Sequence, residues 1–147
     1  MKSVLDASTR DELIHRIGTI TENSVAQWGK MNVYQMLKHC SMWDEMVHKN
    51  NMGKRVFIGR LIGGMALKSV LKDERPLDKN SPTLRELMIS ENGDIAAQKA
   101  KWISLIKQYE HYSQDCFVHP FFGKMTKEQI GRFAYKHTDH HLRQFNS

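Results

Sequence analysis

Two histidines lie on the face of the last predicted helix where core residues would be expected. Residues four apart in a helix are separated by about 6 Å along its axis and share one face. His137 and His141 could therefore bind one cation, as in HxxxH metal sites, or each could simply bond a core partner. Burying two neighbouring imidazoles is costly, and a metal that takes their lone pairs removes that cost. The helical stripe consists of Ile130, Phe133, Ala134, His137, His141 and Phe145.

A third ligand should come from a facing helix, and His39 is the best candidate. It falls on the flank of the second predicted helix, with Met36 and Trp43, one position from the main apolar stripe. Asp44 is five residues further on, about 140° around the helix, which makes it a poor partner for the same ion. Cys40 points along the apolar stripe and is expected to be a buried core residue.

The remaining five of the eight histidines are not expected to bind the metal. His15 and His48 are expected to be exposed, and His111 lies at a frayed helix end. His119 precedes a proline in a loop, where it either lines the mouth of the site or only packs. His140 points about 100° away from His141 and is expected to support a ligand or face solvent.

The elements that must position these residues are helices. Helical periodicity predicts helices over about Ser8–Ile20, Val33–Lys49, Val56–Leu71, Asp94–Tyr112 and Thr126–Phe145. Ser8, Asn32 and Asp94 are expected N-caps, and Thr126 with Gln129 forms a capping box. The aromatic segment 116–123 is expected to be a loop, because no run with strand periodicity and hairpin turns is evident. We therefore expect one all-α domain over residues 1–147.

Composition limits the class of protein. The 147 residues carry a formal charge of +6 that is spread along the chain, so neither a nucleic acid nor a membrane is an expected partner. No secretory signal is evident, the two cysteines show no CxxC spacing, and the apolar stretch 56–67 is too short to span a bilayer. The expected location is cytoplasmic. A weaker alternative has the basic segment 56–71 facing a membrane or nucleic acid, which salt-dependent binding would support.

Three stretches resemble the DinB/YfiT-like superfamily of metal-binding helical proteins, and specifically a DinB-like branch of uncharacterised function. They are Met31–Cys40 (MNVYQMLKHC), His119–Thr126 and Tyr135–Phe145, which together place one histidine on the second helix and HxxxH on the last. The resemblance implies an up-down-down-up four-helix bundle in which His39, His137 and His141 bind a divalent metal. Many relatives carry HRGQ where this chain has His141-Leu142-Arg143-Gln144, so a helix glycine is missing beside the site.

Three histidine ligands leave coordination positions open, whereas structural zinc sites are usually closed by four ligands. The expected ion is Zn²⁺ or Ni²⁺, with Mn²⁺ or Fe²⁺ as alternatives. By analogy with superfamily branches that use thiols, we expect a metal-dependent S-transferase or hydrolase acting on a small molecule, such as a low-molecular-weight thiol. The alternative is a non-catalytic, metal-stabilised bundle that binds a ligand or a partner subunit. No catalytic residue is assigned, and a homodimer is left open.

Overall fold

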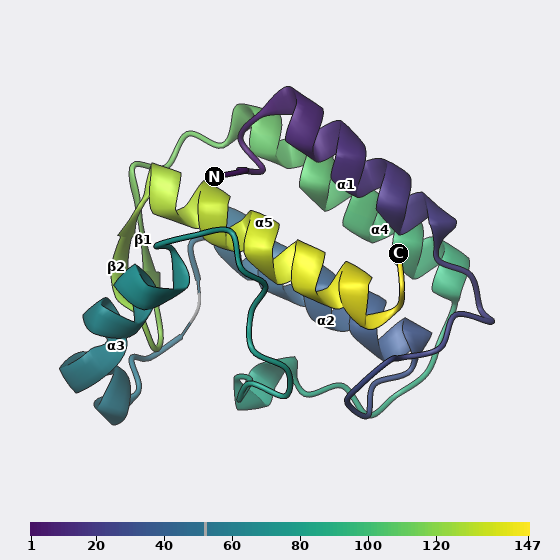
Figure 1. The fold of residues 1–147 in the computed structure, drawn as a ribbon, viewed down its shortest axis with the longest axis horizontal. Helices are drawn as coiled ribbons and strands as arrows, with labels where there is room; N and C mark the ends of the chain where they lie inside the picture. Colours follow the sequence, from purple (N-terminus) through teal and green to yellow (C-terminus); the bar gives the residue numbers. More distant parts are fainter. Residues whose placement is uncertain (52) are drawn as a thin grey trace.

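The computed structural model describes residues 1–51 and 53–147 and is mainly helical (Figure 1). Its α-helices are α1 (Ala7–Thr19), α2 (Val33–His48), α3 (Phe57–Val70), α4 (Ile95–Gln108) and α5 (Lys127–Gln144). Two short 3-10 helices, η1 (Arg85–Leu87) and η2 (Tyr109–His111), and two strands, β1 (Cys116–His119) and β2 (Gly123–Thr126), complete the described elements.

Four of the helices surround the hydrophobic core. α2 packs on α4 and α5, and α1 packs on the same two helices from the other side, as Figure 1 shows. Each helix turns a stripe of apolar side chains inward, which removes their surface from water. The largest side chains that are fully buried include Leu13 and Ile17 of α1, Met36 and Leu37 of α2, Trp102 and Ile106 of α4, and Ile130 and Leu142 of α5.

Most of the predicted helix starts are confirmed. The Asn32 side chain accepts a hydrogen bond from the backbone N–H of Gln35, and the Thr126 hydroxyl accepts one from the backbone N–H of Gln129. Each bond belongs to a complete capping box. Asp94 caps α4 through the Ala97 amide. The first helix is the exception, because Asp6 rather than Ser8 is its N-cap.

The expectation of no strands is wrong. Residues 116–119 and 123–126 form an antiparallel hairpin that pairs Cys116 with Thr126 and His119 with Gly123. Side chains of β1 alternate between exposed and buried, with Phe117 and His119 inward. Four residues are too few for this alternation to stand out from the sequence. Gly123 closes the turn with φ +84°, a conformation that favours glycine.

The third predicted helix forms but contributes only one large side chain, Leu67, to the buried core. α3 packs against β2, and Figure 1 shows it at the periphery beside the hairpin. Of its residues only Gly59, Gly63 and Leu67 are buried. Among the described residues, no helix combines the length and apolar character needed to cross a membrane.

Candidate metal centre

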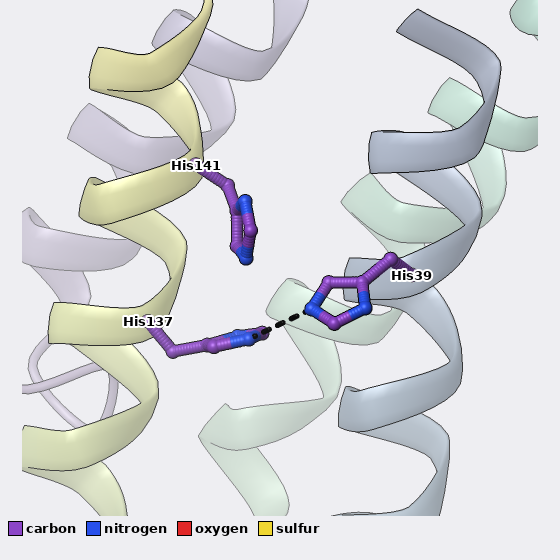
Figure 2. Close-up of side chains that lie close together, drawn as sticks. All are labelled: His39, His137 and His141. Carbon is purple, nitrogen blue, oxygen red and sulfur yellow. Dashed lines mark hydrogen bonds between the residues drawn. The ribbon is translucent and has the colours of Figure 1, made fainter. Parts of the chain in front are cut away.

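α2 and α5 lie side by side and bring the three predicted histidines together. One nitrogen from each of His39, His137 and His141 lies within 4.8 Å of the other two. His39 approaches from α2 and the other two from successive turns of α5, with all three rings directed at a common point (Figure 2). The ring centroids are 4.7 Å apart for His39 and His141, and 4.8 Å apart for His137 and His141.

Hydrogen bonds fix which nitrogen of two rings faces this point. His39 Nδ1 lies 2.9 Å from the backbone carbonyl of Leu87, which can only accept, so Nδ1 carries the proton. His141 Nδ1 lies 2.9 Å from Gln144 Oε1, and the amide of Gln144 is oriented by its donation to the Trp28 carbonyl. In the neutral rings Nε2 is then the atom with the free lone pair.

The environment favours the neutral form of all three rings. Burial lowers the pKa of His39, and burial lowers the pKa of His141 to about 3, with the charge of His39 as a further cause. The pKa of His137 is lowered well below its usual value by burial and by His141 and His39. Neutral imidazole is the form that binds metal ions.

The spacing of the nitrogens fits ligands of one ion. His39 Nε2 and His137 Nε2 are 3.2 Å apart, and two ligands at 2.0–2.1 Å from a tetrahedral zinc are about 3.3 Å apart. Without a cation, one of these nitrogens must carry a proton to bond the other. His39 and His141 are buried, at 4% and 7% exposure, and the ring of His137 is buried with them. The donor set thus suits a divalent metal with open coordination positions.

Aromatic side chains form the wall beside His137. The ring of Trp43 lies 4.7 Å from that of His137, and Phe133 stacks on it at 6.3 Å. These contacts restrict the orientation of His137, which has no backbone partner comparable to that of His39 among the described hydrogen bonds.

The acidic residues near the ligands in sequence are held elsewhere. Asp44 points to α4, where its carboxylate accepts hydrogen bonds of 2.8 Å from Trp102 and from Tyr109. Asp139 pairs with Arg16 at 2.8 Å and with Arg143 at 2.7 Å. Glu45 pairs with Lys101 at 3.0 Å. None belongs to the cluster of convergent ligand atoms found among the described residues.

Cys40 is buried as expected and is not a ligand candidate. It has no exposed surface, and its Sγ lies 3.8 Å from the Met36 sulfur. Burial raises the pKa of the thiol well above its usual value, so Cys40 stays protonated and inert at neutral pH.

The other histidines follow the sequence expectations in part: His48 differs, and His140 does not face solvent. His15 and His111 are exposed. His119 packs, because its Nδ1 accepts from two backbone amides of the turn and its ring lies 4.7 Å from that of Phe122. His140 is buried, with its ring 5.1 Å from that of His141. The expectation that His48 is exposed is wrong: it is half-buried, and a ring nitrogen lies 3.0 Å from the Leu105 carbonyl.

Two groups that orient the ligands were not identified from sequence. Gln144 lies three residues after His141 on the same face of α5, so the i, i+3 spacing could have indicated it. The Leu87 carbonyl comes from a short 3-10 helix 48 residues beyond His39, and no side-chain pattern marks a backbone oxygen.

Comparison with known proteins places the whole chain in one family. A family model described as "Protein of unknown function (DUF1569)" matches residues 1–147, so the chain belongs to the DUF1569 family. A search of curated proteins found no match, and a search of solved structures found none either.

Proposed function

We propose that this DUF1569 protein is a divalent-metal-dependent enzyme that acts on a small molecule at His39, His137 and His141. One observation carries the proposal: three neutral imidazoles from two helices direct nitrogens at one point, with 3.2 Å between two of them. Zn²⁺ or Ni²⁺ suits such a nitrogen set, and Mn²⁺ or Fe²⁺ are the alternatives. The resemblance to DinB/YfiT-like proteins, with their up-down-down-up bundle, supports this proposal.

The chain itself supplies orientation and a partly dry environment. Leu87 and Gln144 hold the Nδ1 protons of His39 and His141, which fixes the tautomers and the ring directions. Trp43 and Phe133 place apolar surface beside His137, which keeps this side of the cluster dry. A bound ion would act as a Lewis acid that lowers the pKa of a water or thiol in an open position.

The proposed reaction is S-transfer or hydrolysis on a small substrate, with a low-molecular-weight thiol as the first candidate. A thiol suits this site because the described residues near the rings offer no free carboxylate to act as a general base. The neighbouring acids are engaged in the ion pairs and hydrogen bonds given above. A thiol bound as thiolate needs no such base once its proton has left to solvent.

The lack of a free carboxylate near the rings also favours a second candidate function. A site without a free acid or base can also serve a metal that only stabilises the helices, in a protein that binds a ligand or partner subunit. Turnover distinguishes the two functions, since both require the metal.

Metal content tests the shared premise. The purified protein should retain about one Zn²⁺ or Ni²⁺ per chain after equilibration and desalting, and the His137→Ala/His141→Ala variant should retain none. His15→Ala/His111→Ala is the matched control, because it removes two exposed histidines. A wild-type chain that retains none of the four candidate metals would contradict the proposal. Metal without turnover of thiols and electrophiles would favour the non-catalytic function.

A further inference from the structure

α3 presents a continuous apolar stripe to solvent. Phe57 is 76% exposed, Leu61 65% and Met65 67%, and Ile58 and Ile62 lie beside them at 52% and 41%. At 100° per residue, these five side chains span about 140° of the helix surface. Scattered apolar residues on a surface need no explanation, but a contiguous patch indicates contact with another apolar phase or partner.

The opposite face of α3 packs against the hairpin. A Cβ atom on Gly59 would lie 2.3 Å from the Phe121 carbonyl oxygen, and one on Gly63 would lie 2.0 Å from it. Only glycine permits this approach, which brings the helix backbone against the turn between β1 and β2. The apolar stripe therefore faces outward as a consequence of how α3 is attached.

The charged residues within α3, and those in the segment that leads into it, are all basic. Between Glu45 and Asp73 the sequence has no acidic residue, and it has six basic ones: Lys49, Lys54, Arg55, Arg60, Lys68 and Lys72. Lys68 falls within the angular range of the apolar stripe, and Arg60 borders it. Both are exposed and could reach anionic groups. Arginine at the border of an apolar face, and a lysine whose long side chain can extend from that face to the headgroups, suit a helix that lies in the interface of an anionic membrane.

We propose that α3 binds the surface of an anionic lipid bilayer, with Phe57, Leu61 and Met65 inserted among the acyl chains and Arg60 and Lys68 at the headgroups. This inference goes beyond the proposed metal-dependent function. With 14 residues, α3 would lie on the membrane and not cross it. A second copy of the chain fits the face less well, because a two-fold contact through α3 would oppose two stretches that are basic and contain no acid.

Vesicle co-sedimentation tests this surface. Wild-type protein should bind vesicles in which a third of the phosphatidylcholine is replaced by phosphatidylglycerol, and it should bind pure phosphatidylcholine at least about tenfold more weakly. Binding should fall when the salt concentration is raised to about 0.5 M.

Matched variants identify the face. Leu61→Ser/Met65→Ser and Arg60→Glu/Lys68→Glu should each lower binding about tenfold or more. Met88→Ser is the apolar control, since Met88 is 69% exposed but lies outside α3, and Lys107→Glu is the charged control on α4. Circular dichroism checks that each variant folds.

Two results would overturn the inference. The first is equal binding of wild type to neutral and anionic vesicles, or no binding to either. The second is a wild-type dimer in sedimentation equilibrium that Leu61→Ser/Met65→Ser converts to monomer, without binding to vesicles, which would assign the face to a second copy.

Discussion

His39 and Asp44 are buried polar residues five positions apart on α2, and they differ in their hydrogen-bonding partners. Both oxygens of Asp44 accept hydrogen bonds from α4, one from the Trp102 indole and one from the Tyr109 hydroxyl that follows the helix. His39 bonds the Leu87 carbonyl through Nδ1, but its Nε2 faces two other imidazoles. Asp44 is satisfied by fixed donors, whereas the lone pairs around His39 converge on one point.

The difference separates a structural polar cluster from a ligand-binding one. A buried acceptor with protein donors on every side ties elements together and needs nothing from solution. Acceptors that face one another are unsatisfied until a proton or a cation arrives. The two clusters should therefore respond to different perturbations.

The largest expected effect is metal-dependent stabilisation at the histidine cluster. A ligand present at about a thousand times its Kd stabilises the folded state by about 4 kcal/mol. Zn²⁺ or Ni²⁺ should produce this gain in wild type and in Asp44→Asn, and no gain in His137→Ala/His141→Ala. Denaturant unfolding with metal and with chelator measures it. An equal gain in the histidine variant would place the ion elsewhere.

Removing the structural acceptor should cost somewhat less. Asp44→Ala leaves the buried donors of Trp102 and Tyr109 without a partner, at about 1–3 kcal/mol for each group. We expect a loss of about 3 kcal/mol in the free energy of unfolding. Asp44→Asn, which can accept from the indole and donate to the Tyr109 oxygen, should lose about 1 kcal/mol.

Metal stoichiometry is the second readout for these Asp44 variants. Both should keep about one ion per chain, because Asp44 bonds Trp102 and Tyr109 and is not part of the cluster of ligand atoms. Loss of the ion from a folded Asp44→Asn variant would show that the two clusters are coupled and not independent.

A smaller effect, on metal affinity, is expected from substitution of Gln144, whose side chain hydrogen-bonds His141. Gln144→Leu removes the acceptor for His141 Nδ1 while keeping a side chain of similar size. Loss of such a partner typically lowers metal affinity 10–100-fold, or about 1.4–2.7 kcal/mol. Competition with a chromophoric chelator measures the affinity. Gln108→Leu, at the exposed end of α4, is the control and should leave the affinity unchanged.

The sequence predicted the helices well because their signals are local. The capping residues Asn32, Asp94 and Thr126 and the apolar stripes lie within each helix, and the structure has them as expected. The hairpin was missed because two four-residue strands show too little alternation. The peripheral position of α3, with only Leu67 in the core, could not be predicted, since an apolar stripe looks the same whether it faces the core or solvent.

The candidate site followed from helical geometry in the same way. The i, i+4 spacing placed His137 and His141 on one face, and the flank of α2 placed His39 opposite them. The structural cluster was not foreseen, because Asp44 depends on partners 58 and 65 residues away. Long-range pairing of this kind leaves no periodic signal in the chain.

The smallest change, about 1.4 kcal/mol for each pH unit, is expected from a pH dependence specific to Asp44. Burial raises the pKa of its carboxyl to about 7, although the Tyr109 and Trp102 donors oppose the shift. In the unfolded chain the pKa is about 3.9. Between these values the folded state holds a proton that the unfolded state has lost, so this stabilising contribution is complete below about pH 4 and is lost as the pH rises towards 7.

Comparison of wild type with Asp44→Asn isolates this contribution. Buried histidines such as His119, whose pKa burial lowers to about 4, give wild type the opposite slope, but they are the same in both proteins and cancel in the difference. From about pH 5 to about pH 6, wild type should lose about 1.4 kcal/mol of unfolding free energy relative to the variant, as urea unfolding would measure. A difference that does not change with pH would mean that the two donors keep Asp44 ionised in the folded protein. The cluster would then stabilise a buried charge, and its contrast with the neutral histidines of the candidate metal centre would be sharper still.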